Sequence, residues 1–154
     1  MIDFKSLASQ DFIKGEGLEI GALHSPFPVR EGVKVKYVDR LNNEELRKHY
    51  TELDKYIMTN VDIVDDGETL ATIPDNSQDF VIESHFIEHA RNPINAIRNA
   101  LRVLKENGVL LLVIPDKNYT MELLRDSTSF AHLIMDDHSL SEARDMQHYE
   151  DFAK

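Results

Sequence analysis

The sequence predicts an α/β fold with a mostly parallel central sheet. Segments with strand character alternate with segments that carry helix start signals over most of the chain, and this alternation favours parallel strands joined by right-handed crossovers. Residues 109–114 form a continuous apolar run, which is typical of a central strand buried on both faces. Small or acidic residues follow the expected strands, and the ligands of such sheets bind beyond the carboxyl ends of the strands.

The composition fits one globular domain. A length of 154 residues and a hydrophobic content of 42% allow a single packed core. The absence of Cys excludes disulfides, thiolate nucleophiles and Cys-ligated zinc. The net charge is −11 and the basic residues are scattered, so we expect no direct nucleic-acid partner and no membrane partner. There is neither an apolar run of membrane-spanning length nor a signal pattern, so a soluble, cytoplasmic protein is expected.

The expected elements follow from periodicity and from capping signals. Strands are expected at residues 18–20, 33–38, 61–64, 80–82 and 109–114. Helices are expected at residues 3–14 (a short helix or arm), from the Asn42 cap to about Asp54, and from Asn92-Pro93 to Asn107-Gly108. A short helix or turn is expected at residues 68–73, and two helical pieces after Tyr119 with a break around Asp136 to Ser139.

The connection between the first two strands is short for a parallel pair. Only residues 23–33 lie between them, and they include Pro26, Pro28 and Gly32. A parallel crossover usually needs a dozen or more residues, commonly a helix. The first crossover helix is therefore expected to be vestigial or to be replaced by an extended loop.

The ends of the expected strands suit a nucleoside ligand. In chain order they carry Glu19-Ile20-Gly21-Ala22, Asp39, Asp65-Asp66, Ser84-His85 and Pro115-Asp116. A carboxylate after the second strand can accept both ribose hydroxyls, an acid after the third can accept the adenine amine, and a glycine after the first lets the backbone approach a ligand. Any single Asp here is better explained as a cap or turn residue, but three successive acids at equivalent positions favour a binding site.

Several motifs resemble class I S-adenosylmethionine-dependent methyltransferases, in particular the methyltransferase type 11 group. They are DGETL with IPDNSQDFVI (residues 66–82), Glu88-His89, Asn92-Pro93, and LRVLKENG with its following strand and Pro115 (residues 101–115). EIGALH, YVDR and PDK (residues 19–24, 37–40 and 115–117) are similar to an uncharacterised branch often found with sugar-transfer proteins. The resemblance covers roughly residues 17–117 and implies a Rossmann-like three-layer sandwich.

The resemblance also implies S-adenosylmethionine as the cofactor and gives roles to individual residues. Glu19, Gly21 and Ala22 would line the methionine moiety, and Asp39, followed by Arg40, would hold the ribose. Asp66, with Gly67 beside it, would meet the adenine, while Ser84 and His85 would flank the sulfonium and the methyl acceptor. The implied layout is one domain over 1–154, with a leading arm (1–16), a cofactor-binding core (17–117) and a helical segment (118–154).

Two departures from the family pattern stand out. Leu23 and Ser25 occupy positions where the first loop of the family usually has glycines. Nothing after Pro115 has the pattern of a strand pair, so the sheet is expected to lack the last strands of the fold, as in a C-terminally truncated chain. An unpaired sheet edge favours a homodimer.

The histidines have competing explanations. His85 is the best candidate for a general base, and a capping or packing role has equal weight. His24 is a candidate for substrate contact, although it also fits an ordinary loop residue, and His89 fits a structural role. A C-terminal group could suggest zinc or iron, but its spacing matches no usual ligand set and favours scattered surface residues; it comprises His132, Asp136, Asp137, His138 and His148.

Three functions remain open at this stage. The first is a methyltransferase that acts on a small-molecule or glycan-related acceptor. The second is a non-catalytic module with a methyltransferase fold, and the third is a nicotinamide-dependent oxidoreductase. The sequence has no dinucleotide fingerprint after the first strand, no phosphate loop and no nucleophile elbow around Ser84, so the first function is favoured.

Overall fold

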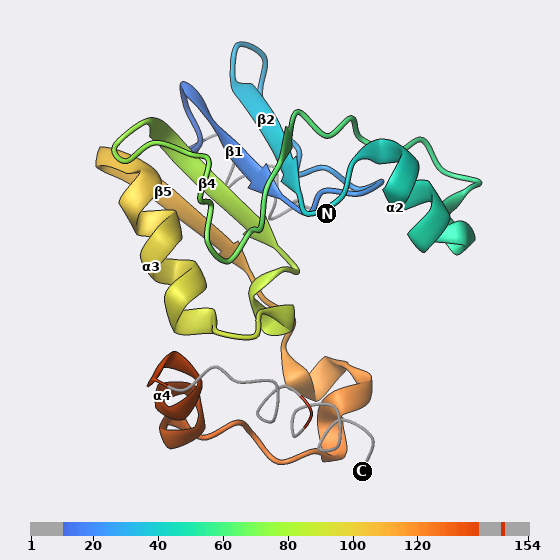
Figure 1. Cartoon of the computed structure of the whole chain (residues 1–154), viewed down its shortest axis with the longest axis vertical. Coiled ribbons are helices and arrows are strands. Elements are labelled where there is room, and N and C mark those ends of the chain that lie inside the picture. Colours follow the sequence, from blue (N-terminus) through green and yellow to red (C-terminus); the bar gives the residue numbers. More distant parts are fainter. Residues whose placement is uncertain (1–10, 139–145, 147–154) are drawn as a thin grey trace.

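Five parallel strands form the central sheet in a computed structural model, which describes residues 11–138 and residue 146. The strands are β1 Glu16–Ile20, β2 Lys34–Asp39, β3 Ile63–Val64, β4 Gln78–Ser84 and β5 Leu104–Val113. Their order in the sheet is β3-β2-β1-β4-β5 (Figure 1). All four pairings are parallel, so the predicted α/β class is confirmed.

The helical elements are short. The α-helices are α2 Asn43–His49, α3 Pro93–Val103 and α4 Phe130–His138. The 3-10 helices are η1 Thr51–Leu53, η2 Ile87–His89, η3 Lys117–Tyr119 and η4 Met121–Leu124. None of the helices in the described part of the chain has the length and apolar character needed to cross a bilayer.

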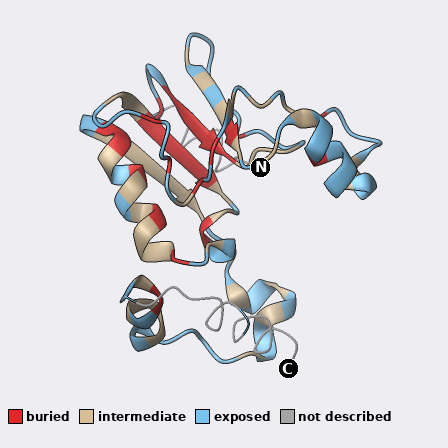
Figure 2. Cartoon of the chain, in the orientation of Figure 1, coloured by how far each residue is buried: buried red, intermediate tan, exposed pale blue. Residues whose placement is uncertain are grey.

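The two central strands, β1 and β4, are the most buried part of the sheet (Figure 2). One face of the sheet packs against α3, in a core that includes Leu18, Val81 and Val103. The opposite face is covered by the segment before β1 and by the loop after it, through Ile13 and Phe27. The elements that cover the two faces therefore exclude water from the middle of the sheet. The carboxyl ends of the strands lie beyond this core.

An extended loop replaces the first crossover helix, which confirms one of the two alternatives that the sequence left open. Residues 21–33 contain no helix, although β1 and β2 are parallel neighbours. The Gly21 amide donates to the Val38 carbonyl at 2.9 Å and continues the pairing past the end of β1. Phe27 is 3% exposed and anchors the middle of the loop in the core.

Helix α2 begins as expected and ends early. Asn42 caps it in a reciprocal capping box with Glu45. The predicted extent to about Asp54 is wrong, because Tyr50, at φ −114° and ψ 64°, leaves the helical region and a separate 3-10 turn follows. β3 is likewise shorter than the predicted 61–64. At residue 62 the amide still donates to the Tyr37 carbonyl, but the Tyr37 amide donates to the Asp62 carboxylate and not to a backbone carbonyl, both at 2.9 Å.

The boundary between α3 and β5 also differs from the prediction. Asn92 caps α3 and Pro93 begins it, as predicted. The helix ends at Val103 and not at Asn107-Gly108, because the last carbonyls bond across the molecule: Asn76 and Ser77 donate to the carbonyls of residues 102 and 103 at 3.0 and 2.8 Å. These bonds draw the chain into β5 five residues before the predicted strand, with an irregular register opposite residues 78–80.

The C-terminal helix attaches to α3 through polar contacts. Arg98 forms an ion pair with Asp137 at 3.0 Å, and the Asn92 side chain donates to the same carboxylate at 3.3 Å. Of the break predicted around Asp136 to Ser139, the described residues show that α4 continues through Asp136 to His138. Ser139 and most of the predicted leading arm lie outside the described residues.

One buried carboxyl group stands out in the core. Glu83, on β4, is 0% exposed, beside Ile20 and Leu112 in the register of the sheet. Within the described residues, neither of its carboxyl oxygens has a hydrogen-bond partner. Burial raises the pKa of Glu83 to about 7 from an ordinary value of 4.5, because a low-dielectric environment disfavours the charged form.

Glu83 should make the free energy of unfolding depend on pH. The pKa of Glu83 is higher in the folded chain than in the unfolded chain, so the protonated side chain contributes to the free energy of unfolding. This contribution is fully present below about pH 4.5 and is lost as pH rises through 7. Between pH 5 and 8, wild type should lose on the order of 3 kcal/mol relative to Glu83→Gln, which cannot ionise. Urea unfolding at several pH values measures this difference. Glu106→Gln, at an exposed position, is the control, and parallel pH profiles for wild type and Glu83→Gln would contradict the prediction.

Gly17 should be the least replaceable glycine of the sheet. A Cβ at this position would lie 2.3 Å from the Phe80 carbonyl oxygen, so Gly17→Ala should force β1 and β4 apart and destabilise the fold by about 3 kcal/mol or more. Gly32→Ala is the matched control, because Gly32 has φ +89° and no atom within 4 Å of the added Cβ. It should cost only about 1–2 kcal/mol of backbone strain. Equal losses in thermal or urea unfolding would refute the close-approach argument.

Candidate functional site

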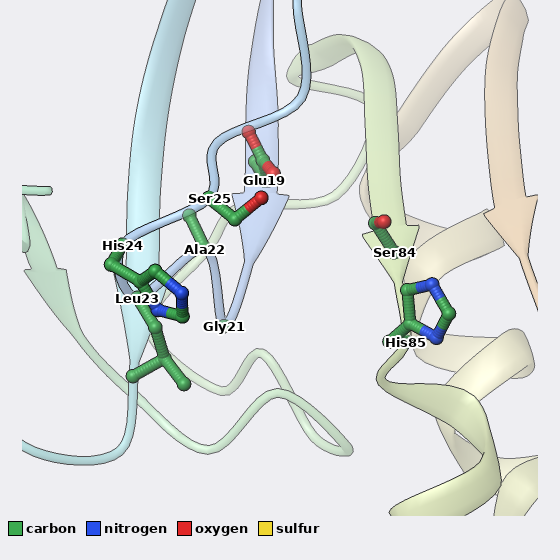
Figure 3. Close-up of a pocket in the computed structure, with 8 residues that line it drawn as sticks. All are labelled: Glu19, Gly21, Ala22, Leu23, His24, Ser25, Ser84 and His85. Atoms are coloured by element: carbon green, nitrogen blue, oxygen red, sulfur yellow. The ribbon is translucent and has the colours of Figure 1, made fainter. Parts of the chain in front are cut away.

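A cavity of about 160 Å³ lies at the carboxyl ends of β1 and β4 (Figure 3). It is lined by Glu19, Gly21, Ala22, Leu23, His24, Ser25, Ser84 and His85. Six of these are site residues predicted from the sequence, and only Leu23 and Ser25 were not. Figure 3 shows the first-loop residues on one side of the cavity and Ser84 and His85 on the other.

Glu19 fixes the wall that the first loop forms. Its carboxylate is 1% exposed, and it accepts the Phe27 backbone amide with both oxygens, at 2.8 and 3.1 Å. A charged acceptor satisfied by a buried donor is a strong anchor. Glu19 therefore sets the path of the loop in addition to lining the cavity.

Gly21 and Leu23 both adopt left-handed backbone conformations. Gly21 has φ +65°, and no atom lies within 4 Å of the position that a Cβ would take, so a ligand can approach the backbone closely there. Leu23 has φ +47°, which is strained for a bulky residue. Its carbonyl accepts the Thr59 amide at 2.7 Å, and this bond ties the strained turn to the chain after α2.

His24 is held by an aromatic neighbour. Its ring stacks on Tyr56 with centroids 4.5 Å apart and an interplanar angle of 28°. The Lys55 ammonium lies 5.1 Å from the centre of the same Tyr56 ring. His24 thus lines the cavity as part of a stack with the segment after η1, which suits a binding surface better than proton transfer.

His85 occupies the opposite wall in a strained conformation. Its φ is +57°, and its amide donates to the Val113 carbonyl at 2.9 Å. The Nδ1 atom lies 3.3 Å from Oε1 of Glu88, in the 3-10 helix η2. The His85 side chain is 54% exposed and that of Glu88 is 21% exposed. The imidazole is therefore accessible to solvent, and the less exposed carboxylate lies beside its Nδ1 atom.

Asp39 and Arg40 stand at the end of β2, outside the lining of the cavity. Asp39 is half-buried and Arg40 is exposed. Burial raises the pKa of Asp39, against the opposing effect of the Leu41 and Arg40 amides and of the Arg40 charge. One Asp39 oxygen accepts the Leu41 amide at a long 3.4 Å, so the carboxylate retains capacity for further donors.

The two acids after β3 have different roles. Asp65 is buried and accepts the Thr72 amide and hydroxyl, both at 2.7 Å. Burial acts to raise its pKa, but these bonds and the Asp66 and Ala71 amides outweigh it and lower the pKa. Asp66 is exposed, and one of its oxygens accepts the Glu68 amide at 2.8 Å. Asp65 therefore holds the loop together, and Asp66 is the acid that faces solvent.

Gly67 has a packing requirement of its own. A Cβ there would lie 2.5 Å from Ile20 and 2.7 Å from Phe86. The next residue, Glu68, accepts the amides of Arg91 and Asn92 at 2.8 and 3.0 Å. The loop after β3 is thus fastened both to the sheet and to the start of α3, which fixes where Asp66 stands.

The C-terminal His and Asp residues do not form a metal centre within the described part of the chain. His132 and Asp136 lie 3.3 Å apart as an i,i+4 pair, but no group of three candidate ligands comes together among residues 11–138 and 146. His148 lies outside these residues.

Comparison with solved structures shows methyltransferase folds. The chain resembles an S-adenosylmethionine-dependent methyltransferase of Aquifex aeolicus, with 18% identity, 88% of this chain and 78% of that chain covered, and a TM-score of 0.53. It resembles a methyltransferase of Thermotoga maritima that is described as a possible histamine N-methyltransferase. The identity is 24%, 81% of this chain and 51% of that chain are covered, and the TM-score is 0.49. It also resembles the YcgJ protein of Bacillus subtilis, with 23% identity, 69% of this chain and 46% of that chain covered, and a TM-score of 0.47.

The chain spans about half the length of the Thermotoga and Bacillus proteins. No match was found among curated proteins. The family profile described as "Methyltransferase domain" matches residues 17–112. This region contains β2, β3 and β4, all of β1 and β5 except one end residue each, and all the residues that line the cavity. Since this match covers more than half of the chain, the protein belongs to the methyltransferase domain family.

Proposed function

We propose that this protein transfers a methyl group from S-adenosylmethionine to a small-molecule or glycan-related acceptor. The observation that carries the proposal is the row of acids at successive strand ends beside a cavity with an open glycine backbone, all within the region that matches the methyltransferase domain family. When bound, the cofactor supplies a methyl group on a positively charged sulfur. The chain's own residues supply binding, orientation and electrostatics.

Asp39 is the residue assigned to the ribose. It is half-buried at the end of β2, and the bond that it accepts from the Leu41 amide is long, at 3.4 Å. A carboxylate with unused lone pairs can accept two neighbouring hydroxyls at once. Burial strengthens such bonds, because the surrounding dielectric is low.

Asp66 is the residue assigned to the adenine. It follows β3, which is the neighbour of β2 in the sheet. Its bond with the Glu68 amide orients the carboxylate and leaves the exposed side of the group to accept an amine. The order β3-β2-β1-β4 thus supports a ligand that lies across the strand ends, with its base at Asp66 and its ribose at Asp39.

The methionine part is assigned to the first loop. Gly21 and Ala22 allow a close approach of the backbone, and Ser84 with His85 closes the cavity from the other side. Leu23 replaces a glycine of the family pattern, and it adopts a left-handed conformation, φ +47°, that glycine adopts readily. The volume of about 160 Å³ suits one end of such a ligand together with a small reacting group.

The proposal is tested by calorimetry with S-adenosylmethionine and S-adenosylhomocysteine on the full chain. Both should bind, and Asp39→Ala should weaken binding at least ~10-fold, because each lost hydrogen bond to a charged acceptor is worth about 1.5–3 kcal/mol. Glu106→Gln, an exposed carboxylate on β5, is the control and should leave binding unchanged. No heat with either ligand at millimolar concentration would overturn the proposal and favour a non-catalytic module.

A further inference from the structure

His85 differs from the other titratable groups of the cavity in how it is held. Glu19 is engaged with the Phe27 amide, and His24 is stacked on Tyr56. His85 keeps a half-exposed ring on the cavity wall, with Nδ1 3.3 Å from a carboxylate oxygen of Glu88. It is therefore the lining group that can present its second ring nitrogen, Nε2, to a ligand while Nδ1 lies beside a carboxylate.

The backbone of His85 adds a second, independent observation. A residue other than glycine at φ +57° carries about 1–2 kcal/mol of strain. The Val113 carbonyl enforces this conformation by accepting the His85 amide at 2.9 Å. Such strain persists where surrounding structure over-determines it, and it clusters at functional sites. Glu88 follows three residues after His85, in η2, and its carboxylate lies beside the His85 ring.

We propose that His85 and Glu88 form a proton-accepting pair, and that the methyl acceptor is accordingly a protic group, a hydroxyl or an amine. The proposal about the acceptor rests on the methyl-transfer function proposed above. An acceptor that carries no removable proton, such as a thioether, needs no base. With such an acceptor, the imidazole beside Glu88 at the cavity wall would have no proton to accept.

The chemical step balances as follows. The acceptor oxygen or nitrogen forms a bond to the methyl carbon, and the carbon–sulfur bond breaks with its electron pair left on sulfur. The acceptor's proton passes to Nε2 of His85. The positive charge that leaves the sulfur thus ends on the imidazolium, where the Glu88 carboxylate stabilises it.

Glu88 is a positioning residue in this scheme. A carboxylate beside Nδ1 favours the neutral tautomer that carries its hydrogen on Nδ1 and leaves a lone pair on Nε2. It also holds the ring orientation, as an acidic partner does for a base histidine in other enzymes. A surface ion pair without a function would not need a strained backbone at His85.

Nitrogen NMR of the 15N-histidine-labelled chain tests the pair without cofactor or acceptor. The spectra are recorded at a pH where imidazoles are neutral, and His85→Gln assigns the signal among the seven histidines. Wild-type His85 should show a protonated Nδ1 and an unprotonated Nε2. Glu88→Ala should shift the ring toward the Nε2-protonated tautomer, while His132, which has its own acidic neighbour, should not change.

Two controls keep the result interpretable. Glu88→Gln preserves the shape of the side chain, and its Nδ1 signal should move in the same direction by a smaller amount. Circular dichroism and thermal unfolding should show that both variants remain folded. Wild-type His85 protonated on Nε2, or a tautomer that is unchanged in folded Glu88→Ala, would overturn the proposal.

Modification by diethyl pyrocarbonate separates this proposal from the proposed cofactor site. Peptide mass spectrometry should show faster ethoxyformylation of His85 in wild type than in Glu88→Ala, and protection by S-adenosylhomocysteine in wild type. A Glu88-dependent rate without protection would retain the pair and count against the cofactor site. Protection with equal rates in both proteins would retain the cofactor site and overturn the pair.

Discussion

The bond between the Glu19 carboxylate and the Phe27 amide is the constraint on which the architecture of the site depends. β1 and β2 are parallel, so the chain must return from one end of the sheet to the other between them. A helix usually makes this return and satisfies its own backbone. Here a proline-containing loop does so, and a buried carboxylate with both oxygens at 2.8–3.1 Å from one amide holds it in place. With Phe27 seated in the core, the loop forms a fixed wall of the cavity.

Two residues with strained backbones lie on the walls of the cavity. Among the described residues, five other than glycine have positive φ, and two of them, Leu23 and His85, lie on opposite walls of the cavity. Each is secured by a backbone bond to a different segment, to Thr59 and to Val113 respectively. At about 1–2 kcal/mol each, such conformations are a substantial fraction of the stability of a small domain. The well-packed pair of central strands offsets this cost, and the strain sets the geometry of the walls.

The sequence predicted the sheet and most of the site because both depend on local patterns. Alternating elements, the Asn42 and Asn92 caps and the strand-end residues are local signals, and the structure gathers six of the predicted site residues around one cavity. The end of α3 could not be predicted, since amides from residues 76 and 77 determine it over a long range. The partnership of His85 with Glu88 was equally hidden, because it requires a left-handed residue 85, which local propensity disfavours.

Three glutamates near the strand ends show how environment assigns a role to one side-chain type. Glu19 is buried and fully engaged, so it acts as a fixed anchor. Glu83 is buried without a hydrogen-bond partner in the described residues, and burial raises its pKa to about 7, so its neutral form is favoured in acid. Glu88 is only partly covered and faces an imidazole. Glu83 and Glu88 are only five residues apart, but their environments differ because of the backbone between them. β4 directs the side chain of residue 83 toward the α3 face, into the core, whereas the turn at residue 85 leads the chain out to solvent.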